Sequence, residues 1–292
     1  MPVLISIVAM VSASAIWGLS GIFYAKLSHL PTIEILAHRI IWSMVVFGGY
    51  LSFKGRFRSL FQKNLFLFET RYLLICAILI SLNWFSFIFA IQTSQAVQAS
   101  FGYYVFPIVA VFFGYLFKGE RFSKYQKLAI FLVIASVCGL AFALRVFPLI
   151  SVVIAITFGT YGLLKGYSQL GPIESVTIET MLLSPLALAI LVYLFLDPSM
   201  RAPNLNIQDY IMLFLSGLLT GGPLILFSYA TRILSYSFVG LLQYINPSLQ
   251  FLVAIVIFNE PYNFGHSIAL VLIWLSIAIY TLDSWRLESK RL

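Results

Sequence analysis

The sequence predicts an all-α membrane protein, and three observations lead to that prediction. Of the 292 residues, 61% are hydrophobic and only 10% are charged, whereas globular proteins have roughly 45 to 50% apolar and about 25% charged residues. Uncharged stretches such as 73–90 and 211–230 reach the roughly 20 residues that a helix needs to cross a bilayer. The apolar runs also lack the period-two alternation of a membrane β-barrel, so helices, which satisfy their own backbone hydrogen bonds in lipid, are favoured.

Ten apolar segments are predicted to be membrane-spanning helices. They are residues 3–25, 33–53, 71–92, 97–117, 124–144, 147–166, 174–196, 209–231, 236–258 and 264–284. The first segment contains "ASA" at Ala13 to Ala15, which resembles the cleavage site of a signal peptide. It lacks a basic region before the apolar run, however, and the run continues to Tyr24. We therefore expect this segment to be retained as a helix.

The net charge of +8 comes from basic residues that gather on one predicted side of the membrane. The even-numbered connections and the C-terminal tail hold fourteen of the 18 Lys and Arg residues. The fourteen are Lys54, Arg56, Arg58, Lys63, Arg71, Lys118, Arg121, Lys124, Lys127, Lys165, Arg232, Arg286, Lys290 and Arg291. By the positive-inside rule both termini are predicted to be cytoplasmic. Anionic lipid headgroups, not nucleic acid, are the expected contact of these charges.

Cysteine and histidine give no sign of a disulfide or a metal site. Cys76 and Cys138 fall inside apolar segments, where we expect them to be small buried hydrophobic side chains. The three histidines, His29, His38 and His266, lack metal-ligand spacing. The sequence also lacks a Walker-type phosphate loop, so we expect no ATP hydrolysis by this chain and no cofactor.

The two halves of the chain resemble each other at a constant offset of 140 residues. "AIWGLSGIFYAKLSHLPTIE" from Ala15 aligns without a gap with "AITFGTYGLLKGYSQLGPIE" from Ala155. The same offset places Tyr104, Pro107 and Glu120 on Tyr244, Pro247 and Glu260. Five helices per half is an odd number, so the second half would begin on the opposite side of the membrane. The sequence therefore predicts inverted repeats, 1–144 and 145–292, as in secondary transporters; coincidental spacing without a transport role is the alternative.

Six stretches carry a resemblance to a known family. They are "GLSGIFYAKLSHLPTIEILAHRIIWS", "LNWFSFIFA", "ASFGYYVFPIVAVFFGYLFKGE", "FGTYGLLK", "GGPLILFSYATRI" and "GLLQYINPSLQFLVAIVIFNEP". In order and spacing, along nearly the whole chain, they resemble the RarD type of the EamA transporters in the drug/metabolite transporter superfamily. The resemblance implies a ten-helix transporter of two EamA repeats in a bacterial inner membrane. It also brings the label of a chloramphenicol-resistance permease and favours export.

Polar and aromatic residues inside the apolar segments mark a predicted solute cavity, because lipid disfavours polar groups that do not face the bundle interior. Aromatic rings beside amides suit an amphiphilic or cyclic solute and can hold a cation by their π faces. The alternative is that the Trp and Tyr residues mark the membrane interface. The predicted cavity residues are Trp17, Ser20, Tyr24, Asn83, Trp84, Tyr103, Tyr104, Tyr161, Gln243, Tyr244 and Asn246.

Five further residues are predicted to act in gating or coupling. Pro107 and Pro247 each remove a backbone hydrogen bond inside an apolar segment, and static packing kinks are the alternative. Arg39 and Glu179 are equivalent at the 140-residue offset. With His38, they indicate an alternating gate or a proton-linked site. Snorkelling and static ion pairing are the alternative for these charges.

Other features are predicted to be structural. Glu120 and Glu260 follow apolar segments, and we expect each carboxylate to serve the N-terminal amides of the next helix or to pair with a neighbour such as Arg121. The GxxxG spacings at 162–166 and 217–221 predict close packing between helices, with hinge motion as the alternative.

These features together predict a secondary transporter that moves a small organic solute by alternating access, with the proton as a candidate coupling ion. A passive channel is one alternative. Another is an intramembrane enzyme in which Ser20 of "GLSG" acts as nucleophile, a motif that resembles the rhomboid proteases. The expected partners are the solute and membrane lipids, and a homodimer is left open.

Overall fold

The computed structural model describes residues 2–61, 63–93, 96–144, 149–197, 205–258 and 264–289, and these residues form only helices and their connections. The α-helices are α1 (Pro2–Ala25), α2 (Thr32–Phe53), α3 (Lys63–Gln92), α4 (Ala96–Lys118), α5 (Lys124–Leu144), α6 (Leu149–Lys165), α7 (Pro172–Leu196), α8 (Ile207–Ala230), α9 (Tyr236–Leu242), α10 (Ile245–Val256) and α11 (Phe264–Ser289), with a short 3-10 helix, η1 (Arg58–Phe61), between α2 and α3. The predicted all-α class is therefore confirmed for the described residues.

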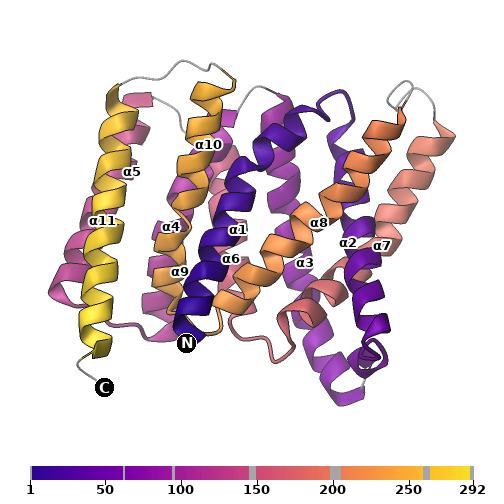
Figure 1. The fold of residues 1–292 in the computed structure, drawn as a ribbon, viewed down its shortest axis with the longest axis horizontal. Coiled ribbons are helices and arrows are strands. Elements are labelled where there is room, and N and C mark those ends of the chain that lie inside the picture. Colours follow the sequence, from indigo (N-terminus) through magenta and orange to yellow (C-terminus); the bar gives the residue numbers. More distant parts are fainter. Residues whose placement is uncertain are drawn as a thin grey trace.

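The helices lie side by side in an elongated bundle (Figure 1). The pair α5 and α11 stands at one end and the pair α2 and α7 at the other, with the remaining helices between them. α1 begins and α11 ends on the same side of the bundle (Figure 1). Large hydrophobic side chains are exposed on the outer faces, among them Phe131, Phe195 and Val271. Such an apolar exterior is typical of helices that face lipid.

Among the described residues, six stretches are long and apolar enough to cross a bilayer. They are Pro2–Ala25, Thr32–Phe53, Arg71–Gln92, Pro172–Leu196, Ile207–Ala230 and Tyr236–Val256. Shorter apolar stretches lie at Gly102–Lys118, Leu149–Lys165 and Val271–Tyr280. Ten spans in inverted repeats therefore stay a prediction, although the described part of every predicted segment is largely helical.

Two helices extend well beyond their predicted segments. α3 begins at Lys63 instead of residue 71, and α11 continues to Ser289 instead of residue 284. The added residues include charged ones. Segments chosen for their apolar residues leave such residues out, although charged residues are compatible with a helix. Cys138 also corrects a prediction: unlike the buried Cys76, it is exposed, because it lies on the outer face of α5.

The ninth predicted segment is not one helix but two. α9 ends at Leu242 and α10 begins at Ile245. Between them the backbone tightens, since the amide of Asn246 donates to the carbonyl oxygen of Gln243 at 3.0 Å. Pro247 has no N–H with which to reach that carbonyl, so the tighter bond takes its place. In the first half, by contrast, Pro107 lies inside the continuous helix α4.

The core is built between the two halves of the chain. The most extensively packed helix pairs are α4 with α6, α2 with α7, α5 with α11, α2 with α8, α1 with α8, α3 with α6, and α1 with α10. In each of these pairs one helix comes from the first half and the other from the second. One hydrophobic cluster accordingly extends from Met10 in α1 to Tyr280 in α11.

Glu120 joins the halves at a helix junction. Its carboxylate accepts hydrogen bonds from the backbone N–H of Tyr236 at 2.6 Å and of Ser237 at 3.3 Å, and from the Ser237 hydroxyl. A carboxylate at these amides satisfies donors that have no partner within α9. A structural role at a helix junction is thus confirmed for Glu120, but its partners are amides of α9 and not, as expected, those of the next helix, α5. Glu260 lies outside the described residues.

The GxxxG pair in α8 brings this helix against α2. A Cβ atom at Gly217 would lie 2.7 Å from backbone atoms of Trp42 and Ser43, and one at Gly221 would overlap the ring of Phe47. The Ser43 hydroxyl donates to the carbonyl oxygen of Gly217 at 2.9 Å. Small residues therefore permit this crossing, as their spacing predicts.

This packing predicts that Gly217→Ala lowers the free energy of unfolding by about 1 to 3 kcal/mol, because the backbone of α2 must move away from the new methyl group. Gly222→Ala is the matched control: a Cβ atom there meets nothing within 4 Å. The control is expected to keep or slightly raise stability, since alanine favours helix. Thermal unfolding of the purified proteins in detergent measures both, and equal stability of the two variants would contradict the packing argument.

Candidate functional site

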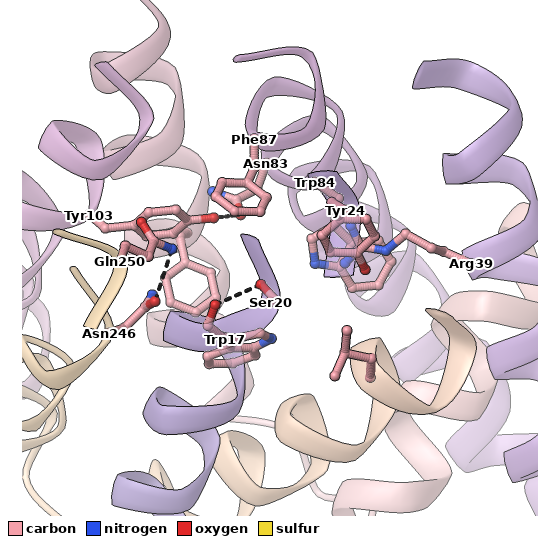
Figure 2. A pocket seen from close by; sticks show the side chains of 12 residues that line it. Trp17, Ser20, Tyr24, Arg39, Asn83, Trp84, Phe87, Tyr103, Asn246 and Gln250 are labelled. Carbon is pink, nitrogen blue, oxygen red and sulfur yellow. Dashed lines mark hydrogen bonds between the residues drawn. The ribbon is translucent and has the colours of Figure 1, made fainter. Parts of the chain in front are cut away.

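A pocket lies between helices of both halves of the chain (Figure 2). It has about 410 Å³ of empty space, counting the part that is open to solvent. Seven helices line it: Trp17, Ser20 and Tyr24 come from α1, Arg39 from α2, Asn83, Trp84 and Phe87 from α3, Tyr103 from α4, Phe158 from α6, Leu219 from α8, and Asn246 and Gln250 from α10.

The pocket lies nearer one side of the bundle than the other. Tyr24 is close to the end of α1, Phe87 is close to the end of α3, and Tyr103 belongs to the first part of α4. These helix ends lie on the side opposite to the start of α1 (Figure 1). The pocket is therefore displaced away from the side on which the chain begins.

Amide and phenol groups form a hydrogen-bonded wall of the pocket (Figure 2). The Asn83 amide donates to the carbonyl oxygen of Ile154 at 3.0 Å, and its oxygen accepts from the Tyr103 hydroxyl at 3.2 Å. The Gln250 amide donates to the amide oxygen of Asn246 at 3.0 Å. Because each side chain holds another, this wall has a defined shape without any ligand.

Arg39 brings a positive charge to the opposite wall. Its side chain is 3% exposed, and its Nε atom donates to the Thr220 hydroxyl at 2.8 Å. The guanidinium carbon lies 4.9 Å from the ring centre of Tyr24 and 4.7 Å from that of Trp84, within the range of cation–π attraction. An arginine inside a membrane bundle is costly and therefore marks a candidate functional site.

Glu179 forms a separate buried ion pair. One of its carboxylate oxygens lies 2.6 Å from the ammonium group of Lys165, and the other accepts from the Tyr161 hydroxyl at 3.1 Å. Lys165 also donates to the Ser175 hydroxyl at 2.5 Å. Lys165 is fully buried at the end of α6, so placing it among the basic residues of a connection was wrong. Because Lys165 lies at the edge of an apolar segment, the sequence did not indicate that it pairs with Glu179.

An aromatic cluster connects the pocket with this ion pair. Trp17 and Phe158 line the pocket, and their ring centres are 5.5 Å apart. Phe227 lies 5.1 Å from Phe158 and 6.4 Å from Tyr161, the residue that donates to Glu179. The cluster therefore fills the interior between the pocket and the Lys165–Glu179 pair.

Seven of the eleven predicted cavity residues line the pocket: Trp17, Ser20, Tyr24, Asn83, Trp84, Tyr103 and Asn246. Arg39, predicted as a gating residue, lines it as well.

The other predicted residues lie elsewhere. Tyr161 belongs to the ion pair, and half-buried His38 precedes Arg39 in α2 without lining the pocket. Gln243 accepts from the Ser14 hydroxyl at 3.2 Å at the break between α9 and α10. Tyr104 and Tyr244 are also buried outside the pocket, with ring centres 6.2 Å apart.

Sequence reasoning missed four lining residues. Phe87 follows Asn83 by four positions, and Gln250 follows Asn246 by four, so helical periodicity could have placed both on the lining face. Phe158 and Leu219 carry no polar group and gave no comparable signal.

Ser20 does not have the setting of a catalytic nucleophile. Its hydroxyl donates to the carbonyl oxygen of Trp17, in its own helix, at 2.6 Å. None of the described residues that line the pocket is histidine, aspartate or glutamate. A base within hydrogen-bond reach, which such chemistry needs, is therefore missing from this pocket.

Removing one member of the buried pair should destabilise the protein more than removing both. Glu179→Gln leaves the Lys165 ammonium without a carboxylate, so we expect a loss of about 3 to 5 kcal/mol in the free energy of unfolding, and Lys165→Met should cost a similar amount. The double variant Lys165→Met/Glu179→Gln carries neither charge and is expected to approach the wild type. Thermal unfolding in detergent provides the comparison, and a double variant as unstable as the single ones would argue against the pairing.

The chain matches a family model twice, at residues 4–142 and 147–282, and the family is described as the EamA-like transporter family. The uncharacterized transporter YojE of Bacillus subtilis is 33% identical over 279 residues, which cover 94% of this chain and 93% of that protein. Protein RarD of Escherichia coli is 33% identical over 280 residues, covering 94% and 92%.

A solved structure described only as "Crystal structure of protein" has the same fold, with a TM-score of 0.69 at 18% identity. The match covers 96% of this chain and 97% of that chain. The two family matches and the RarD relatives together identify the chain as a RarD-type member of the EamA-like transporter family.

Proposed function

We propose that this protein is a secondary transporter that moves a small organic solute by alternating access between two inverted five-helix repeats. The observation that carries the proposal is the pocket between helices of both halves, with an aromatic cluster and a buried ion pair beside it. A site between two repeats is typical of secondary transporters. The family is one of membrane transporters, and its bacterial members support a location in the inner membrane.

The two repeats would be residues 1–144 and 145–292. Two family matches of similar length, 4–142 and 147–282, support this division. The helix contacts support it further, since the pair α1 with α8 has its counterpart in α6 with α3, and the pair α1 with α10 has its counterpart in α6 with α4. In this scheme α9 and α10 together form the ninth of ten spans. An even number of spans fits the start of α1 and the end of α11 on the same side (Figure 1).

The side on which the chain begins would be cytoplasmic. The connections at that side carry Lys54, Arg56 and Arg121, and Lys118 ends α4 beside them, in keeping with the positive-inside rule. Removing Lys165 from the earlier count leaves this asymmetry in place. The pocket is then displaced toward the outer face, and the aromatic cluster with the Lys165–Glu179 pair closes the route to the cytoplasm.

Transport between the pocket and the cytoplasm requires the aromatic cluster and the Lys165–Glu179 pair to move apart. The break between α9 and α10 is a candidate hinge, because the backbone there already departs from regular helix. Protonation of Glu179 would cancel its attraction for Lys165, so this carboxylate is our candidate for proton coupling. Export is favoured by family resemblance, and membrane lipids and a second copy of the chain are further proposed partners.

Filling the pocket should stop transport. Leu219→Trp places a large ring in the pocket, whereas Leu218→Trp, on the same helix, adds a ring to an exposed position. We expect at least about a tenfold loss of counterflow in proteoliposomes for Leu219→Trp. A tenfold loss corresponds to about 1.4 kcal/mol of solute binding free energy, and a ring that displaces the solute should cost at least that much. The matched variant should transport like the wild type, and equal transport by both variants would remove the pocket from the solute path.

The same proteoliposomes, tested with a panel of metabolites and drugs, distinguish a carrier from a channel. Saturable counterflow supports alternating access, whereas rapid and unsaturable flux would favour a passive channel.

Proton coupling is tested separately in the double variant Lys165→Met/Glu179→Gln, which avoids an unpaired buried charge. We expect it to keep counterflow and to lose accumulation driven by a proton gradient. Accumulation at the wild-type level would exclude Glu179 as the coupling residue.

A further inference from the structure

Two buried donors at the pocket have no hydrogen-bond partner among the described residues. They are the Nη1 atom of Arg39 and the hydroxyl group of Tyr24, on side chains that are 3% and 2% exposed. Both residues line the pocket, and Figure 2 shows Arg39 reaching toward the ring of Tyr24. Buried donors are nearly always satisfied, so two such groups side by side call for an acceptor that the protein itself does not supply.

The charge of Arg39 also lacks a counter-ion among the described residues that line the pocket. None of the 12 residues drawn as its lining is aspartate or glutamate. Glu179, the equivalent residue in the second half, is already paired with Lys165 at 2.6 Å. A buried cation is stabilised when an anion joins it, so the missing acceptor should carry a negative charge.

The aromatic faces at this wall are already occupied by a cation. The guanidinium group of Arg39 lies over the rings of both Tyr24 and Trp84. A cationic solute at the same faces would meet like-charge repulsion in a medium that screens it poorly. The position of Arg39 therefore argues against a solute cation at the rings of Tyr24 and Trp84.

Charge balance further favours a carboxylate over a doubly charged phosphate. One guanidinium group balances one negative charge, whereas a doubly charged phosphate would keep a second, unbalanced charge in the interior. The planar fork of arginine also fits a planar carboxylate, even with its Nε atom bound to Thr220. Trp17, Phe158 and Leu219 offer apolar contact to the remainder of the solute.

We propose that the transported solute is a monocarboxylate with an apolar or aromatic body, whose carboxylate binds Arg39 and Tyr24. This inference rests on the proposed transport function and names the chemical class that the pocket accepts.

Three probes of one shape test the inference: 3-phenylpropanoate, its neutral amide and 3-phenylpropylamine. Trp17 and Trp84 line the pocket, so tryptophan fluorescence of the purified protein reports binding. We expect the carboxylate to bind at least about tenfold more tightly than the amide, as charge-assisted hydrogen bonds are roughly twice as strong as neutral ones. The amine is expected to bind most weakly.

Arg39→Gln should remove this preference, lowering carboxylate affinity about tenfold or more while leaving amide affinity within about twofold, because only the charged contact is lost. Tyr24→Phe removes one hydroxyl group with little change of shape and should weaken carboxylate binding severalfold, which keeps the inference testable if Arg39→Gln fails to fold. Arg56→Gln is the matched control: Arg56 is 67% exposed and pairs with Glu174 outside the pocket. It should bind all three probes like the wild type.

Equal binding of carboxylate and amide by the wild type, preference for the amine, or no binding of any probe would overturn the inference. So would unchanged carboxylate binding by Arg39→Gln. Counterflow of neutral or cationic solutes alone would reject the carboxylate and leave alternating access standing. If the protein instead bound the carboxylate selectively but showed no counterflow of any solute, the carboxylate site would stand and the transport function would be contradicted.

Discussion

The arrangement of this bundle depends on how its apolar interior accommodates charge. In lipid, a charged side chain must find a partner inside the protein or a route to water. Lys165 and Glu179 neutralise each other within two adjacent helices, so their region is electrostatically complete. Arg39 contacts aromatic faces and one hydroxyl group, so the charge in its region is not neutralised. The second half thus holds a neutralised ion pair, whereas the first half holds a charge that no described residue of the pocket lining neutralises.

Packing between the halves determines how the molecule can move. The closest helix pairs connect one half to the other, so neither half has a separate core of its own. Glycine contacts bring α8 against α2, and the carboxylate of Glu120 binds the first amides of α9. Under the proposed alternating access, a movement that keeps these contacts would be a rotation of the halves about the pocket and not their complete separation.

Much of this structure could be predicted from sequence, because polar residues inside apolar helices are a strong signal. The signal does not give the direction of a side chain: Tyr103 and Tyr104 are neighbours, yet successive residues of a helix point about 100° apart, and only Tyr103 lines the pocket. Phe158 and Leu219 escaped detection because apolar side chains line pockets and pack in cores alike. The pairing of Lys165 with Glu179 depends on the conformation of the connection between α6 and α7. The distribution of charges along the sequence does not determine that conformation.

The break between α9 and α10 distinguishes the backbone of the second half from that of the first. Its counterpart α4 continues as one helix through Pro107, although both halves carry the proline. Bending at an existing break disturbs fewer helical hydrogen bonds than bending a continuous helix. Under alternating access, the two opposite conformations would then differ in energy even with identical solutions on both sides. A duplicated architecture can in this way have a preferred resting orientation, set by the backbone alone.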